Sequence, residues 1–207
     1  MKPTRYSALA LAAAALCAAS SAQAIEYAQL DTSSSATTAV LVHALGASSP
    51  DTPAPLVSAT YARWDTGDAT AAGVVYRWSV GGDTHHWVVG AGAGINDFHD
   101  RADPAARHDT RSSARVQSEW YGPAPGGTYY VLAQASSFRG SWLATAQYAP
   151  SGLPVAVEWS RYHERGYQAT NLGLRFALGS PRWFLRAGNT RADGESRPYI
   201  GIAYNGF

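Results

Sequence analysis

Cysteine, lysine and long apolar runs are almost absent from this chain. Its single cysteine, Cys17, lies in the N-terminal segment, so the rest of the chain can form no disulfide and no thiolate metal site. Lys2 is the only lysine, and beyond residue 24 there are 14 arginines against 15 acidic residues. This near-neutral balance argues against a nucleic-acid partner. After residue 24, no stretch has the roughly 18 or more apolar residues that a transmembrane helix requires.

The first 24 residues have the composition of a cleaved secretory signal. Lys2 and Arg5 form a short positive region, residues 8–19 form an apolar core, and Ala22-Gln23-Ala24 is a small-x-small cleavage site. The apolar core is too short to span a bilayer, so residues 1–24 are expected to be removed. Cleavage leaves residues 25–207, a length of 183 residues that suits one domain. An exported chain without a membrane helix is soluble in the periplasm, secreted, or a β-barrel of the outer membrane.

Alternation of polar and apolar residues with a period of two predicts β-strands. Residues 114–121, 155–160 and 171–178 each place polar or charged side chains on one face and mainly apolar side chains on the other. A soluble β-sandwich turns its apolar face inward, whereas a membrane barrel turns that face outward against lipid. Alternation alone does not separate these two folds.

The number of strands favours a barrel. We expect an all-β fold, a single antiparallel transmembrane β-barrel of about 12 strands within a range of 8–12, because an even count returns both ends to the periplasmic side. The predicted strands cover residues 25–32, 36–46, 55–65, 71–80, 85–96, 113–122, 128–137, 141–149, 154–163, 167–178, 182–190 and 197–207.

The connections alternate in character along the chain. Every second one is rich in Gly and Pro, as at residues 81–84, 122–127, 150–153 and 179–181. The intervening ones are polar or charged, as at residues 65–70, 97–112, 163–166 and 191–197. Tight periplasmic turns and longer exterior loops are typical of transmembrane barrels. Residues 47–54 are long for a periplasmic turn and fit this pattern least well.

Aromatic residues lie close to both sets of connections, as expected for girdles at the two membrane interfaces. Those beside the tight turns are Trp78, Trp87, Trp120, Tyr129, Tyr148 and Trp183, and those near the exterior ends are Trp64, Trp142 and Tyr162. Such residues are also common in β-strands of any kind.

The last strand carries a family resemblance. Residues 198–207, with the sequence PYIGIAYNGF, resemble the C-terminal signature of bacterial outer-membrane β-barrels, which ends in an aromatic residue. The resemblance implies that Phe207 is an assembly signal read by the barrel-assembly machinery. One feature departs from the family pattern, because Asn205 takes an apolar position on the face of Phe207 and Ile200 and Ile202 lie on the opposite face. A bulge at residues 205–206 would restore the phase.

The arrangements found in barrel enzymes are incomplete. Barrel phospholipases and lipid A deacylases share a His-x-Ser pair, but His163 is followed by Glu164 and Arg165. Omptin-type proteases combine an Asp-x-His pair with an Asp-x-Asp pair. Residues Asp97 and His99 supply the first pair, and the chain has no Asp-x-Asp. We therefore do not expect an enzyme.

Neither a metal nor a cofactor is expected. His85 and His86 are adjacent, so on a strand they face opposite ways and do not chelate together. Gly90, Gly92 and Gly94 lack the further glycine and the helix of a dinucleotide site. Their spacing instead clears one face of a strand for a packed side chain or a close neighbour.

The alternation places six charged residues on the inward face: Arg77, Arg115, Glu119, Glu158, Arg175 and Arg186. Charges on the lipid face would cost about 2–4 kcal/mol each at mid-depth, which favours the lumen. These residues either line a selective pore or form an ion-pair network that fills a narrow interior.

Three functions remain open. The first is a small channel or export pore, similar in layout to small porin-like or exopolysaccharide-export barrels, whose arginines favour anionic or hydroxylated cargo such as a small solute or polysaccharide. The second is a closed structural or surface-interaction barrel that uses residues 97–112 for recognition. The third is a barrel hydrolase acting on lipid or peptide. In each case the predicted location is the outer membrane of a Gram-negative bacterium, in contact with its lipid and lipopolysaccharide.

Overall fold

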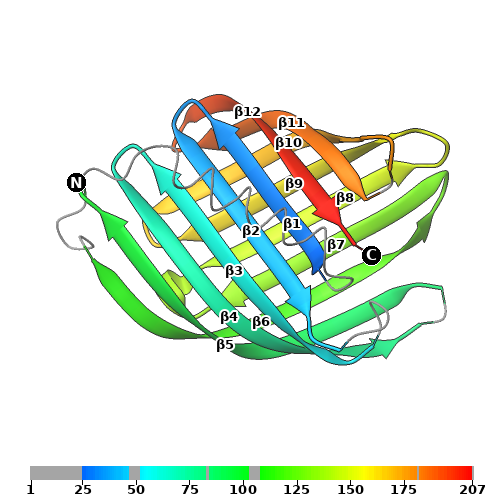
Figure 1. Ribbon diagram of the computed structural model, residues 1–207, viewed down its shortest axis with the longest axis horizontal. Helices are drawn as coiled ribbons and strands as arrows, with labels where there is room; N and C mark the ends of the chain where they lie inside the picture. Colours follow the sequence, from blue (N-terminus) through cyan, green and yellow to red (C-terminus); the bar gives the residue numbers. More distant parts are fainter. Residues whose placement is uncertain (1–24, 47–51, 83, 103–107, 181, 207) are drawn as a thin grey trace.

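The described part of the chain folds into twelve antiparallel strands and one short 3-10 turn. The computed structural model describes residues 25–46, 52–82, 84–102, 108–180 and 182–206 (Figure 1). No helix in this part of the chain is long and apolar enough to cross a membrane. The elements are β1 (Ile25–Ser33), β2 (Ala36–Ala44), β3 (Ala54–Trp64), β4 (Gly67–Gly81), β5 (His86–Asp100), β6 (Asp109–Ala124), β7 (Gly127–Ser136), η2 (Phe138–Gly140), β8 (Trp142–Pro150), β9 (Val155–Glu164), β10 (Tyr167–Ala177), β11 (Trp183–Ala192) and β12 (Glu195–Asn205).

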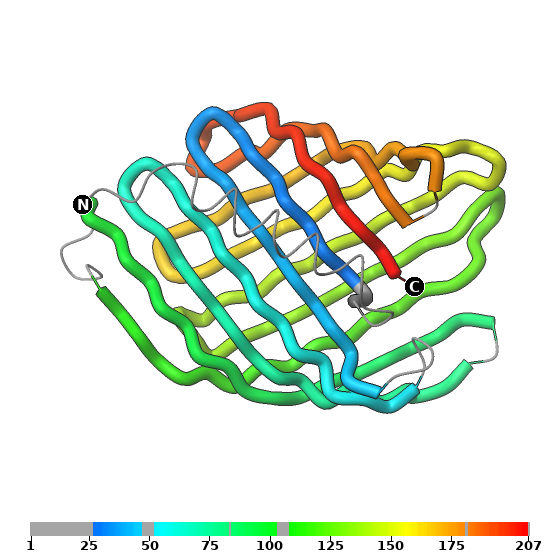
Figure 2. Tube along the Cα trace, in the orientation of Figure 1, coloured from blue at the N-terminus to red at the C-terminus, as the bar shows by residue number. Residues whose placement is uncertain are grey.

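The sheet closes on itself. Each strand pairs with its neighbours in sequence, and β1 pairs with β12 from Tyr27↔Asn205 to Ser33↔Tyr199. Figures 1 and 2 show the first strand lying beside the last, which completes the barrel. The predicted all-β class and the predicted count of twelve strands are both confirmed. Closure leaves no unpaired sheet edge, as a structure that spans a membrane requires.

One set of side chains faces the lumen and the other faces outward in every strand. In β9, for example, Ala156, Glu158 and Ser160 are buried, whereas Val157 and Trp159 between them are exposed. Large apolar residues are exposed all round the barrel, including Ile95 (56%), Val116 (55%) and Leu172 (59%). An apolar outer face combined with a polar interior distinguishes a membrane barrel from a soluble sandwich.

The strands extend further than alternation predicted. We call the end at which β1 begins and β12 ends the near end, and the opposite end the far end. At the far end, Phe98 pairs with Asp109, so the predicted loop at residues 97–112 shrinks to residues 101–108. Residues 65–70 likewise reduce to a turn at 65–66, and residues 191–197 to a turn at 193–194. Here the ladder continues beyond the apolar band, where both faces are polar and alternation disappears.

The expected difference in loop length between the two ends is therefore weak. Two-residue connections occur at both ends, for example residues 125–126 at the near end and residues 165–166 at the far end. Glycine makes these tight turns possible, since Gly126 and Gly166 have φ angles of 72° and 82°.

The aromatic prediction holds better at the near end than at the far end. Trp78, Trp87 and Trp120 are exposed on the outer face near that end. At the far end Trp142 also faces outward, but Trp64 and Tyr162 lie on the inward faces of β3 and β9. Trp64 packs against buried Phe98 with 5.5 Å between ring centroids. Proximity to a turn was a poor guide, because strand phase decides which way a ring points.

Both ends of the sequence carry predictions that fall outside the described residues. These are the signal at residues 1–24 and the assembly role of Phe207. The pairing of β12 with β1 is regular through Asn205, with Ile200 on the outer face. No bulge occurs before Asn205 on the described part of this strand.

Candidate functional site in the barrel lumen

All six charged residues predicted for the lumen are buried. They come from β4, β6, β9, β10 and β11, where alternation turns these positions inward. Five of the six take part in ion pairs with acidic or basic partners. Arg115 is the exception among the described residues. The charged set therefore divides into two paired clusters and one single arginine.

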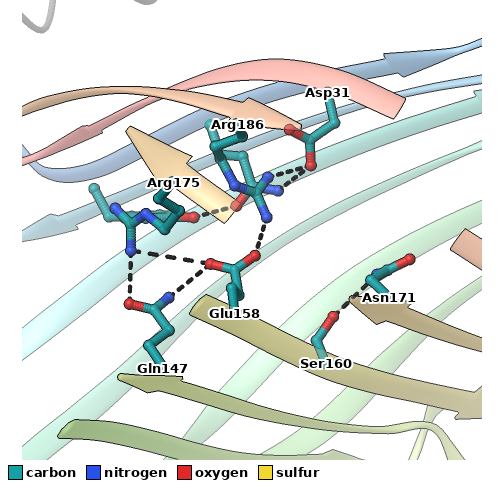
Figure 3. Close-up of polar contacts among 9 residues, drawn as sticks. Asp31, Gln147, Glu158, Ser160, Asn171, Arg175 and Arg186 are labelled. Carbon is teal, nitrogen blue, oxygen red and sulfur yellow. Dashed lines mark hydrogen bonds and ion pairs between the residues drawn. The ribbon is translucent and has the colours of Figure 1, made fainter. Parts of the chain in front are cut away.

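The larger cluster lies on β1 and β8 to β11. Arg186 bridges two carboxylates, donating hydrogen bonds to Asp31 and to Glu158. Gln147 also donates to Glu158 at 2.8 Å, and Arg175 donates to the Gln147 oxygen at 2.6 Å. Figure 3 shows these five side chains converging from neighbouring strands. Two guanidinium groups and two carboxylates balance one another, so the cluster carries no formal net charge.

The smaller cluster lies on β4, β6 and β7. Nη1 of Arg77 is 3.4 Å from Oε1 of Glu119, and both side chains are buried. Gln117 and Tyr130 donate further hydrogen bonds to the same carboxylate, at 2.9 Å and 3.2 Å. A buried carboxylate with three donors is well compensated for its loss of water.

Arg115 is held by neutral groups and by glycine. Its Nη1 donates to Ser58 at 3.3 Å and its Nη2 donates to Asn96 at 3.2 Å. A Cβ atom at Gly73 would lie 2.5 Å from Nη1, and one at Gly94 would lie 2.5 Å from Nε. The guanidinium therefore rests on bare backbone of β4 and β5. This contact confirms that the glycines of β5 leave room for a packed side chain, although sequence did not identify Arg115 as the neighbour.

The ion pairs follow the wall instead of crossing the lumen. Asp31 and Arg186 belong to strands that are two apart in the sheet, and the same holds for Arg186 and Glu158 and for Arg77 and Glu119. Same-face side chains on strands two apart are about 10 Å apart at the backbone, a distance that an arginine can bridge. These pairs thus link strands around the wall.

Two tyrosines lie on opposite walls of the barrel. Tyr27 on β1 donates to Gln29, which donates to Asp31 of the larger cluster. Tyr130 on β7 belongs to the smaller cluster. Strands β1 and β7 are opposite one another in a ring of twelve. Each phenol therefore extends one of the two clusters.

A second polar layer lies at the far end. Arg139, in η2 between β7 and β8, places its guanidinium 4.3 Å from the centroid of Phe98 on β5 and 3.7 Å from the carboxylate of Glu164 on β9. Its Nη2 also donates to the backbone oxygen of Arg165 at 2.9 Å. Phe98 and Glu164 both face inward. Arg139 thus links β5 and β9, which lie on either side of the β7–β8 connection, from a backbone with φ of 50°.

Sequence reasoning missed several partners. Asp31 and Gln29 show the same alternation as the predicted charges, so the phase of β1 was a usable signal for both. Asn96 lies on the same face of β5 as the three glycines before it, so its inward orientation was equally predictable from the sequence. Arg139 lies between strands, and nothing in the sequence indicated that its side chain turns inward.

The other candidate groups lie away from the lumen. Asp97 and His99 are on the outer phase of β5, where Asp97 is 3.7 Å from His108 and His99 is 3.6 Å from Asp68. His85 shares a hydrogen bond of 2.9 Å with Tyr129 near the opposite end. No group of three or more His, Cys, Asp or Glu residues within the described ranges could hold a metal ion.

Comparisons with known proteins identify the fold. No family model matches the chain, and no curated protein matches it. Among solved structures, the KdgM porin matches with a TM-score of 0.54 and 9% identity, covering 88% of this chain and 98% of that one. The Acinetobacter baumannii outer membrane protein Omp33 matches with a TM-score of 0.51 and 10% identity, covering 88% and 99%. The chain has the fold of the bacterial outer-membrane β-barrels, and its closed form and apolar outer face fit that membrane.

Proposed function

Starting from an outer-membrane barrel with a charged lumen, we propose that the protein is a narrow channel that favours small anionic solutes. The observation that carries this proposal is the isolation of Arg115. The paired clusters cancel their own charge, so Arg115 is the one uncompensated charge among the six predicted lumen residues. A guanidinium without a counter-charge is costly in a dry interior, which favours water or a mobile anion beside it.

The class of solute follows from the chemistry of arginine. Its planar fork of donors suits a carboxylate or a phosphate, which accepts two parallel hydrogen bonds. A solved structure with the same fold is described as the KdgM porin in complex with disordered oligogalacturonate, with a TM-score of 0.53 and 9% identity. Oligogalacturonate carries carboxylates on sugar rings. We therefore propose sugar acids and short acidic oligosaccharides as the solutes to test first.

Reversal potentials in planar bilayers test this proposal. Refolded parent protein should conduct, and in a salt gradient its reversal potential should indicate a preference for anions. Arg115→Gln should move that potential toward zero, since the uncompensated charge is removed. Arg111→Gln is the matched control, because Arg111 is on the same strand but is exposed and paired with Asp109 at 2.6 Å. An unchanged potential in the Arg115 variant would contradict the proposal.

A closed structural or surface-interaction barrel is the second candidate. It is favoured by the Arg139 layer at the far end. A parent protein that shows no conductance, and still shows none after Arg139→Gly, would favour this closed barrel. Conductance that oligogalacturonate blocks would favour the channel.

A further inference from the structure

Two exposed arginines lie side by side on the outer wall near the far end. Arg161 on β9 pairs in register with Thr170 on β10, and Thr170 pairs with Arg191 on β11. These three residues therefore form one row across three neighbouring strands, and all three belong to the outward phase. Arg161 and Arg191 are both exposed.

Neither arginine has an acidic partner among the described residues. Arg161 instead lies over the ring of Trp142, 5.9 Å from its centroid, and His163 stacks on the same ring at 5.8 Å. Elsewhere on the wall, the outward Arg63 on β3 has an acidic residue in register with it, Asp68 on β4. The row on β9 to β11 is thus a local excess of positive charge.

The row stands at the border of the lipid-facing surface. Trp159 and Leu172 form the next outward row on β9 and β10, and they are exposed by 39% and 59%. Val157 and Leu174 form the row after that, exposed by 43% and 41%. Cationic groups directly beside a continuous apolar surface match a lipid with an anionic headgroup. A water-soluble anion has no apolar group that would contact this apolar surface.

The spacing suits one phosphate group. Neighbouring strands are about 4.8 Å apart, so the two arginine backbones lie roughly 10 Å from one another with Thr170 between them. Two long guanidinium side chains and one hydroxyl can converge on a single phosphate over that distance.

The geometry points to a binding site for the phosphorylated glycolipid of the outer leaflet. Arg161, Thr170 and Arg191 bind a phosphate of lipid A, and its acyl chains lie along Trp159, Leu172 and Leu174. We assign the far end to the outer leaflet. The reason is that β1 begins and β12 ends at the near end, and both ends of such a barrel are expected on the periplasmic side. This site is independent of whether the lumen conducts.

Native mass spectrometry of the refolded barrel with purified lipid A tests the site. The double variant R161Q/R191Q should bind lipid A about 10-fold more weakly or worse, because two charge-assisted contacts are lost. The control R63Q should bind as the parent does. Heat-modifiable migration checks that each variant is folded, and R161K/R191K should restore most of the binding.

Two further ligands distinguish binding of a lipid phosphate from binding of free phosphate. Dephosphorylated lipid A should bind the parent as weakly as lipid A binds the double variant, and excess inorganic phosphate should not displace lipid A. Equal binding by the parent and the double variant would overturn the proposal. So would an equal loss in R63Q, retention of dephosphorylated lipid A, or displacement by inorganic phosphate.

Discussion

Replacing Glu158 with glutamine should disrupt the larger lumen cluster without changing its shape. Glu158 is buried and accepts hydrogen bonds from Arg186 and Gln147, with Nη1 of Arg175 at 3.9 Å. After Glu158→Gln, Asp31 is the remaining carboxylate beside two guanidinium groups. The cluster then holds an excess positive charge among side chains that are almost fully buried.

The expected loss of stability is large for one substitution. Removing one partner of a buried ion pair typically costs about 3–5 kcal/mol, since the other charge is left buried and uncompensated. Glu158 is 4% exposed and Arg186 is also 4% exposed, so little water reaches either group in the folded barrel. We therefore expect a loss within that range.

The matched control is the double variant Glu158→Gln/Arg175→Gln. It removes one charge of each sign and leaves the Asp31–Arg186 pair intact. We expect the double variant to be more stable than the single one, in contrast to independent additive effects. Urea titration of the refolded barrel in lipid vesicles, followed by heat-modifiable gel migration, measures both free energies of unfolding. A loss below about 1 kcal/mol for Glu158→Gln, typical of a solvated pair, would refute the reasoning.

Two further predictions concern the far end. Arg139→Gly should relieve a left-handed backbone and remove the side chain that joins Phe98 to Glu164, so single-channel conductance should rise; unchanged conductance would show that the layer does not restrict the mouth. An epitope inserted after Ala105, within the connection between β5 and β6, should be labelled by antibody on intact cells, whereas labelling only after lysis would invert the assigned orientation.

The architecture could be predicted from the sequence because inward and outward residues alternate along every strand of a barrel. Alternation in residues 171–178 and 155–160 located β10 and β9 and placed Arg175 and Glu158 on the same side of the wall. The ends of the strands were harder to predict. At residues 97–100 and 109–112 the ladder runs beyond the lipid, so polar residues occupy both faces and resemble a loop.

Pairing between side chains was beyond sequence reasoning. Glu119 and Arg115 occupy the same face of β6, yet Arg77 neutralises Glu119, and Arg115 turns instead toward Ser58 and Asn96. Which neighbour a long side chain reaches depends on register between strands. Gly73 and Gly94 are in register with one another, and only the three-dimensional structure revealed that the guanidinium of Arg115 lies against both.

The bridge from Asp31 to Arg186 has a consequence for the order of assembly. These residues are 155 positions apart in the sequence, and their strands are joined through β12, on which β1 closes. Contacts with such long separation form late, since the ends of the chain must first be brought together. Arg186 can pair with Glu158 on β9 while the sheet is still open. It can pair with Asp31 after β1 has paired with β12. While β1 and β12 are unpaired, the Asp31 carboxylate lacks its arginine partner. The ion pair therefore stabilises the closed barrel relative to an open intermediate.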